Sequence, residues 1–313
     1  MALALSQACA TPPRESPPVV PPTLQAEADR LADLGYTRWL EAATRVAEIG
    51  DRLRVAAAPW CGDDLTPATG IGWTRRTWTQ NIYGPAVSRR FADDRVYVVF
   101  VAKGMAGERA GFRIGDVLLD APFYELLFVD DPEAEGPRRV RIERAGEELE
   151  LEIDAPLGCN WISLLQESEL ANAYASPNRR GPSFAVVHRP VVREARTEDL
   201  ALILGHEFGH LLIERGSVDR ARRGADREAQ ADYLGAYLVA RAGYALDASS
   251  DRLFTSVVGR DDIAALSLTQ SSARSHPVTP ARTLALRATL DEIERKLREQ
   301  ADLVPDGLRV AAP

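Results

Sequence analysis

The sequence predicts an α+β protein in which helices lie on either side of a long strand-rich stretch. Helices are predicted over the segments 23–58, 199–215, 226–235, 251–268 and 281–300. Residues 63–156 instead contain short β-prone runs separated by turn residues. With 313 residues and 45% hydrophobic content, the chain can bury two modest cores, so one or two domains are expected.

Charge and hydropathy exclude two classes of function. The formal net charge of −8 argues against general binding of nucleic acids, which requires a basic surface. No stretch approaches the roughly 18 uninterrupted apolar residues of a membrane span. The chain is therefore expected to be soluble or merely anchored.

Residues 1–22 combine a short apolar run, Met1 to Cys9, with a Pro-rich stretch. This pattern resembles the end of a bacterial lipoprotein signal, with Cys9 as the lipidated residue and the Pro-rich stretch as a tether. It predicts a periplasmic, lipid-anchored protein of the bacterial cell envelope. The alternative is a disordered tail of a cytosolic protein.

The segment 23–58 is predicted as a long amphipathic helix. Its apolar residues alternate at spacings of three and four: Trp39, Ala42, Val46, Ile49 and Leu53. Gly35 is expected to break or bend the first part of this helix.

Strand signals dominate the stretch from 63 to 156. Val96 to Ala102 is a strongly β-prone run. The runs 138–142 and 148–153 alternate around Ala145-Gly146, which predicts a hairpin with its turn at these two residues.

The strongest functional signal is His206-Glu207-Phe208-Gly209-His210. Two histidines four residues apart on a helix lie on nearly the same face, so both imidazoles can reach one metal ion. Glu207 lies beside them, close enough to act on a water at that metal. This H-E-x-x-H arrangement suits zinc. With only four His in 313 residues, a chance occurrence of this spacing is a weak alternative.

A catalytic zinc site needs a third protein ligand. Glu214 continues the same helix face, but three ligands along one helix would span about 12 Å and could not converge on one ion. On the next predicted helix, Glu228 and Asp232 lie one turn apart. We predict that Glu228 is the third ligand and that Asp232 accepts a hydrogen bond from the far nitrogen of a ligand histidine.

Other acids compete for this assignment. Asp219 and Asp226 lie close enough in sequence to supply the third ligand instead. Glu228 and Asp232 would then be ordinary solvated charges on a helix.

These motifs, with two more, resemble those of a known family. H-E-x-x-H followed by a helix with E-x-x-x-D is the pattern of the gluzincins. Asn172-Ala173-Tyr174 lies upstream of it, and His276-Pro277 with Arg282 lies downstream. In this order the four motifs resemble those of the HtpX-like metallopeptidases, which are related to the CAAX prenyl proteases. The resemblance covers about residues 157–290.

The resemblance implies a zincin-type, mainly helical metallopeptidase domain over residues 157–313, with a small sheet at the substrate edge. It also implies that an N-terminal helix within residues 23–62 packs on this domain. By the same resemblance, Asn172 helps to hold the substrate backbone, while His276 and Arg282 stabilise the oxyanion. One zinc ion per chain is expected, with Glu207 as general base and then general acid.

The stretch 63–156 resembles a PDZ domain of the bacterial protease type. Residues 106–119 carry its A-G-[LF]-x-x-G-D-x-[IVL] segment, and Gly70-Ile71-Gly72-Trp73 resembles the loop whose backbone amides receive a peptide C-terminus. The resemblance implies that an extended peptide pairs with a sheet edge while the N–H groups of Gly70, Ile71 and Gly72 hold its carboxylate. The alternative is an insert that merely packs or gates access.

Two cysteines, Cys61 and Cys159, flank this insert. A disulfide between them would staple its two connections together and close a long loop. Disulfides persist in the periplasm and are rare in the cytosol. His188, on a predicted edge strand over 183–188, is expected to be structural.

The function predicted on these grounds is that of a zinc-dependent endopeptidase. Its substrates would be proteins or peptides of the cell envelope, and its role protein quality control. One alternative is a peptide-binding adaptor or chaperone with a latent metal site, which the intact H-E-x-x-H set disfavours. Another is a cytosolic zinc hydrolase of non-peptide substrates, which the location of the protein would exclude.

Overall fold

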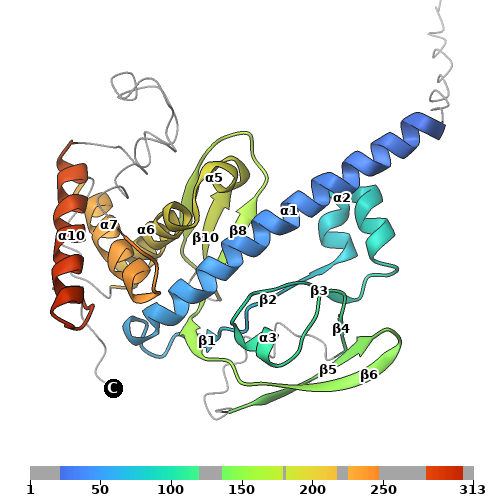
Figure 1. The fold of residues 1–313 in the computed structure, drawn as a ribbon, viewed down its shortest axis with the longest axis horizontal. Coiled ribbons are helices and arrows are strands. Elements are labelled where there is room, and N and C mark those ends of the chain that lie inside the picture. Colours follow the sequence, from blue (N-terminus) through green and yellow to red (C-terminus); the bar gives the residue numbers. More distant parts are fainter. Residues whose placement is uncertain (1–21, 120–135, 179–180, 217–224, 247–279, 306–313) are drawn as a thin grey trace, which may run out of the picture.

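The computed structural model describes residues 22–119, 136–178, 181–216, 225–246 and 280–305 (Figure 1). Several sequence predictions fall outside these ranges: Cys9 and the leader, Asp219, the helix over 251–268, and His276. None of the described helices is both long enough and apolar enough to cross a bilayer.

Helix α1, Pro22–Ala57, runs diagonally across the molecule (Figure 1). It passes through Gly35 without interruption, so the expected break there is wrong. A single glycine inside a long helix costs only about 1 kcal/mol, which the packing of α1 on both halves of the protein offsets. Tyr36 and Trp39 pack against Tyr83 on one side. Further along α1, Val46, Ile49 and Leu53 enter the core around the predicted metal helix.

A five-stranded antiparallel sheet fills the insert, in the order β2-β3-β4-β5-β6. Its strands are β2 (Ile71–Arg75), β3 (Val96–Val101), β4 (Val117–Leu118), β5 (Arg138–Arg144) and β6 (Glu147–Ile153), and the short helix α3 (Ala106–Arg109) precedes β4. The predicted hairpin is confirmed, because Ala145 (φ 53°) and Gly146 (φ 85°) form the turn between β5 and β6. Positive φ at both turn positions suits the twist of a two-residue hairpin.

The sequence reasoning missed helix α2, Arg76–Arg90. Gly84 and Pro85 interrupt its pattern, and the helix is kinked at Tyr83 (φ −127°, ψ 29°). The kink is stabilised from the other half of the molecule, because the Tyr83 hydroxyl donates to Glu167 Oε1 at 2.6 Å.

Two short strands connect this insert to the rest of the chain. The 3₁₀ turn η1, Ala58–Trp60, leads from α1 into β1 (Leu65–Pro67), which pairs antiparallel with β7 (Leu157–Cys159). The predicted disulfide is present and joins Cys61 to Cys159 at this two-stranded stem.

The second half of the protein is built on a three-stranded sheet of order β8-β10-β9. Its strands are β8 (Trp161–Gln166), β9 (Ala173–Ser176) and β10 (Ser183–His188). The expectation that 183–188 is an edge strand is wrong, since β10 pairs with β8 in parallel and with β9 antiparallel. Its buried run Ala185-Val186-Val187 is typical of a central strand, which is covered on both faces.

Helices complete this half of the chain: α5 (Arg189–Glu194), α6 (Thr197–Arg215), α7 (Ala225–Arg241) and α10 (Pro280–Arg298). Arg45 of α1 donates to the carbonyl oxygens of Val192 and Ala195 at 2.9 and 2.7 Å, which fixes the chain just before α6. Trp161 of β8 stacks on Phe208 of α6 with ring centroids 4.6 Å apart. These contacts hold α6 between α1, the sheet and α7.

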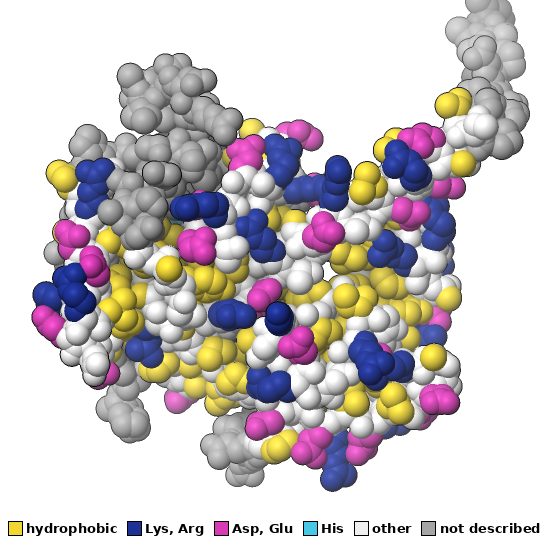
Figure 2. All heavy atoms as spheres, viewed as in Figure 1, with side chains coloured by type: hydrophobic (Ala, Val, Ile, Leu, Met, Phe, Trp, Pro, Cys, Tyr) yellow, Lys and Arg dark blue, Asp and Glu magenta, His cyan; other side chains and the backbone are white. Residues whose placement is uncertain are grey.

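The fold class is α+β, as predicted, with separate buried cores for the five-stranded sheet and for the half that contains α6. The PDZ-like character of the insert, a mainly helical second half and the boundaries at 22/23, 62/63 and 156/157 stay predictions. On the face drawn in Figure 2, Lys and Arg side chains are interspersed with Asp and Glu side chains.

Candidate metal centre

Helix α6 carries His206, Glu207 and His210 through the core of its half. A capping box starts it: Asp199 accepts a hydrogen bond from the backbone N–H of Arg196, and Gly216 ends it in the left-handed conformation (φ 79°). Every residue from Asp199 to Ile213 is buried. A polar triad inside such a helix requires partners, because unpaired buried polar groups are unfavourable.

Those partners come from α7. Glu228 Oε2 lies 3.4 Å from His206 Nε2, and Glu228 Oε1 lies 3.3 Å from His210 Nε2. The two Nε2 atoms are themselves 3.1 Å apart. Three ligands at the zinc bond lengths of about 2.0–2.1 Å in tetrahedral geometry would be about 3.3 Å from one another. The three side chains therefore fit a zinc ion, and among the described residues they form a group able to bind a metal.

Glycines bring α7 close enough to place Glu228 there. A Cβ atom on Gly235 of α7 would lie 2.6 Å from the backbone nitrogen of His206, and a Cβ on Gly209 of α6 would lie 2.4 Å from the carbonyl oxygen of Ala231. Real Cβ atoms do not approach backbone this closely, so the two helices cross in backbone contact only because these positions lack side chains.

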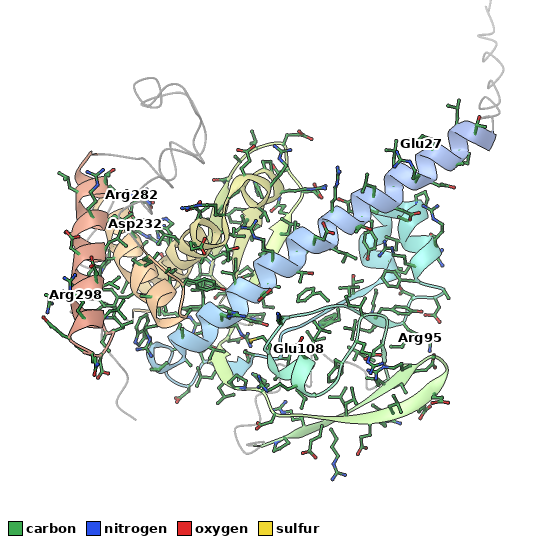
Figure 3. All side chains as sticks on the ribbon, in the orientation of Figure 1. Glu27, Arg95, Glu108, Asp232, Arg282 and Arg298 are labelled. Atoms are coloured by element: carbon green, nitrogen blue, oxygen red, sulfur yellow. A yellow bond between two sulfur atoms is a disulfide. The ribbon has the colours of Figure 1, made fainter. Side chains whose placement is uncertain are left out.

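Asp232 contacts His206 on the ring nitrogen opposite the one that faces Glu228. Its Oδ1 is 2.8 Å from His206 Nδ1, so Nδ1–H donates to the carboxylate and Nε2 keeps its lone pair for a metal. Arg282 of α10 then holds Asp232 by two hydrogen bonds, from Nε to Oδ2 at 2.5 Å and from Nη2 to Oδ1 at 2.8 Å. The two side chains lie together between α7 and α10 in Figure 3.

The charges around His206 favour a cation at this place. Burial lowers the pKa of His206, but the negative charges of Asp232, Glu228 and Glu207 outweigh it and raise the pKa to about 9. Burial lowers the pKa of His210, and the charge on His206 adds to this effect. Burial by itself would raise the pKa of Asp232, but Arg282 and His206 lower it. The same negative charges that raise the pKa of His206 would favour a metal cation among these side chains.

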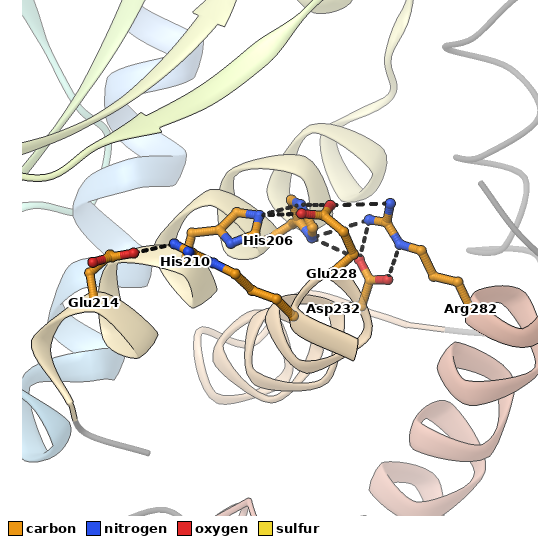
Figure 4. Close-up of polar contacts among 7 residues, drawn as sticks. His206, His210, Glu214, Glu228, Asp232 and Arg282 are labelled. Carbon is orange, nitrogen blue, oxygen red and sulfur yellow. Dashed lines mark hydrogen bonds and ion pairs between the residues drawn. The ribbon is translucent and has the colours of Figure 1, made fainter. Parts of the chain in front are cut away.

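Glu214, which helix geometry excludes as the third ligand, lies apart from the cluster in Figure 4. Glu214 lies a turn beyond His210 and pairs with Arg227 rather than joining the three ligands. Arg282 approaches the same cluster from α10, with Nη1 3.4 Å from Glu228 Oε2 and Nη2 3.4 Å from His206 Nδ1. Asp219, the side chain of Asp226 and His276 lie outside the described residues.

Asn172 directly precedes strand β9, and its carbonyl oxygen accepts a hydrogen bond from the His188 N–H at 2.9 Å. Residues facing each other in an antiparallel ladder alternate between bonded and non-bonded pairs. The backbone groups of Ala173 and Ala175 therefore point away from β10, toward the other side of β9. Within the described ranges no strand pairs with that side.

The predicted peptide-receiving loop lies at the start of β2, across α1 from the helices α6 and α7 (Figure 1). Gly70 has φ 69°, and Gly70 and Ile71 are buried. The Gly70 N–H donates to Asp51 Oδ2 of α1 at 3.1 Å, and the Ile71 N–H donates to Thr69 Oγ1 at 3.3 Å. Gly72 pairs with Phe100 across the sheet.

Sequence reasoning missed two parts of the centre. The clamp of Arg282 on Asp232 joins residues 50 positions apart, which no local spacing reveals. The close crossing of α6 and α7 did leave a signal, because Gly205, Gly209 and Gly235 lie inside helices that otherwise favour larger residues.

One protein-family model matches part of this chain. Residues 138–218 match the model of peptidase family M48, a segment that runs from β5 through the whole of α6. No match was found among curated proteins or among solved structures. The family match confirms the resemblance to HtpX-like metallopeptidases, which are zinc enzymes. It ends before α7, so the assignment of Glu228 rests on the geometry.

Proposed function

We propose, on the premise that this chain belongs to the HtpX-like M48 metallopeptidases, that it is a zinc-dependent endopeptidase. The observation that carries the proposal is the convergence of His206, His210 and Glu228 in one buried cluster beside Glu207. Zinc bound there would lower the pKa of a water molecule and polarise the scissile carbonyl.

Glu207 is the general base of the proposed reaction. It takes the proton of the attacking water and returns it to the leaving amine, acting first as base and then as acid. Its carboxylate lies close enough to the ligands to raise the pKa of His206. Asp232 keeps the proton of His206 on Nδ1, so Nε2 stays directed at the metal position. The oxyanion donors proposed from the family are His276 and Arg282.

The open side of β9 is the proposed substrate-binding edge. Backbone groups of Ala173 and Ala175 are directed there, so an extended peptide could add to the sheet by main-chain hydrogen bonds. Asn172 at the beginning of this strand is placed to hold the substrate backbone. Main-chain pairing of this kind suits a protease that accepts many sequences.

The cell envelope is the proposed location, and quality control of envelope proteins the proposed role. The Cys61–Cys159 disulfide supports this, because such bonds persist in oxidising compartments. The insert is proposed to act as a PDZ-like domain that recognises exposed C-termini or gates access. Lipid attachment at Cys9 belongs to the same proposal.

The test uses the full chain loaded with zinc and fluorescein-labelled casein as substrate. Glu207→Gln should keep about one zinc per chain and lose activity by about 10²- to 10⁴-fold, the usual contribution of a general base. Glu228→Gln should lose zinc on dialysis, while Glu214→Gln, on the same helix as the histidines, should keep both zinc and activity. Casein hydrolysis by Glu207→Gln at the wild-type rate would refute the proposed mechanism.

A wild type that binds zinc and unfolded chains but hydrolyses none would instead favour an adaptor or chaperone. Among the described residues β2 ends the strand order of the insert's sheet, and an edge strand is compatible with that function. Zinc content and casein hydrolysis together separate the two.

A further inference from the structure

The loop expected to receive a peptide C-terminus already binds a carboxylate from elsewhere in the chain. Gly70 N–H donates to Asp51 Oδ2 at 3.1 Å. The other oxygen of the same carboxylate, Oδ1, lies 3.3 Å from Arg54 Nε. A backbone N–H together with a guanidinium is a favourable environment for the carboxylate of a peptide end.

The direction of the Gly70 amide is fixed by the backbone. Gly70 has φ 69°, a conformation that disfavours any other residue, and its ideal Cβ would lie 2.3 Å from Met105 Cβ. Its carbonyl oxygen accepts from the Ala102 N–H at 2.7 Å, as in an antiparallel pair. In such a pair the Gly70 N–H would return the bond to the carbonyl oxygen of Ala102, but it donates to Asp51 of α1 instead.

Packing keeps α1 beside this loop. Val55 of α1 lies against the small buried cluster of Ala68, Ala102 and Met105. Burial raises the pKa of Asp51, although Arg54 and the Gly70 amide act in the opposite direction. The charge of Asp51 is therefore held at a buried place by the Gly70 amide and by Arg54.

We propose that Asp51 is an internal competitor for peptide C-termini: it occupies the Gly70 amide in the resting protein, and a free terminal carboxylate binds the insert by replacing it. This inference rests on the proposed peptide-binding role of the insert, but it does not depend on zinc or on hydrolysis. It assigns the partner as a chain end with a free carboxylate, in contrast to an internal segment or an amidated end.

The test reads the Gly70 amide directly in the full chain. Thr69-Gly70 is the only Thr-Gly pair in the sequence, so labelling Thr carbonyls with ¹³C and Gly nitrogens with ¹⁵N gives one correlation peak for Gly70. The background is Glu207→Gln, to prevent hydrolysis of the probe. The probes are two pools of acetylated random hexapeptides, one with free C-termini and one with amidated C-termini.

In the Asp51-intact protein the Gly70 proton should resonate downfield, and Asp51→Asn should move it upfield, because a charged acceptor forms the stronger hydrogen bond. The free-carboxylate pool should then shift this peak at concentrations about ten- to a hundredfold lower in Asp51→Asn than with Asp51 intact, the value of one charged hydrogen bond. The amidated pool should shift it in neither protein.

Three results would overturn the proposal: an unchanged Gly70 peak in Asp51→Asn, equal concentrations for the two proteins, or equal effects of the two pools. Because Arg54 also donates to Trp161 O at 3.0 Å and to Thr66 O at 3.1 Å, loss of Asp51 could disturb the stem. Asp51→Glu keeps the charge and should therefore behave as the Asp51-intact protein.

Glu48→Gln, one turn earlier on α1, is the matched control and should leave the Gly70 peak unchanged. Zinc content and casein hydrolysis, measured separately on the wild type, report on the proposed enzyme and not on this loop.

Discussion

Arg282 has contacts that give it a positioning role in addition to the oxyanion role that the family resemblance implies. The family resemblance implies that Arg282 donates to the oxyanion. In the structure its guanidinium donates two hydrogen bonds to the carboxylate of Asp232 and forms an ion pair with Glu228. A planar guanidinium with two parallel N–H bonds holds a carboxylate in one orientation. Because this carboxylate accepts a hydrogen bond from His206 Nδ1, Arg282 also helps to fix the orientation of the His206 ring.

Arg282→Lys separates these two roles. A lysine keeps the positive charge but cannot form the paired hydrogen bonds, so Asp232 and His206 should be held less firmly. We expect zinc affinity to fall about 10- to 100-fold, as for other residues that orient metal ligands. Competition with a fluorescent chelator measures this. Unchanged zinc affinity with a large loss in kcat would show instead that Arg282 acts on the reacting carbonyl.

The residues of the centre differ in how far they could be predicted. His206, Glu207 and His210 lie within one helical turn, so their spacing alone fixes their common face. Glu228 and Asp232 were predictable once a second helix was expected, because they too are one turn apart. The clamp by Arg282 was not, since it depends on how α10 packs against α7.

At the scale of elements, the crossing of α6 and α7 sets the distance between the histidines and Glu228. The helices touch through Gly205, Gly209 and Gly235. A helix pair with ordinary side chains at the contact stays about 8–10 Å apart between axes. The metal centre therefore depends on the close approach of α6 and α7, which these three glycines permit.

Gly235→Ala tests this dependence. Its new Cβ would meet the backbone of Gly205 and His206 at 2.6 Å, so α7 must move away from α6. We expect a loss of about 1–3 kcal/mol in the free energy of unfolding, as for overpacking in a core, and weaker zinc binding. Gly84→Ala is the control, because a Cβ there meets nothing within 4 Å. Equal zinc binding by both variants would contradict the role of the close crossing.

The start of α6 makes the protein sensitive to acid. Hydrogen bonds from the Arg196 side chain lower the pKa of Asp199, against the opposing effect of partial burial. A carboxylate whose pKa is lowered by folding contributes stability above its unfolded pKa of about 3.9, and this contribution is lost as the pH falls through its folded pKa. Asp199→Asn should therefore lower stability by about 0.5–1 kcal/mol at pH 7 and by less below pH 4. Urea unfolding of both proteins across this range measures it; a difference independent of pH would contradict it.

Elements themselves were predictable where one local pattern dominated. The amphipathic stripe of α1 and the β5–β6 hairpin follow from periodicity and turn residues. Helix α2 was missed because Gly84-Pro85 breaks the helical pattern, while Tyr83 stabilises the kink through Glu167, a contact from the other half. The apolar run Ala185-Val186-Val187 is a signal for the central place of β10, but the pairing of β10 with β8 and β9 does not follow from these residues.

The whole molecule is held together at the stem formed by β1 and β7. The disulfide closes a loop between residues 98 positions apart, and Arg54 of α1 donates to carbonyl oxygens of both β1 and β8 beside it. Loop closure of this length restricts the unfolded chain strongly. The insert and the metal-binding half are thus covalently tied where they meet.

Replacing both cysteines, Cys61→Ser with Cys159→Ser, should lower the free energy of unfolding by about 2–4 kcal/mol. Chemical denaturation measures the change, and limited proteolysis should show faster cleavage near the stem. Reduction of the wild type with dithiothreitol is the comparison and should give the same loss. An equally stable double variant would contradict a structural role for the bond.

The stem also makes the insert exchangeable. Pro67 and Leu157 are register partners in adjacent antiparallel strands, so the chain enters and leaves the insert at nearly one point. A different module could occupy that point, provided that two contacts with the present insert were replaced with it: the packing of Tyr36 in the outer half of α1, and the hydrogen bonds of Glu167 and Arg189 with Tyr83. The insert and the metal-binding half can in this way be recombined as separate modules.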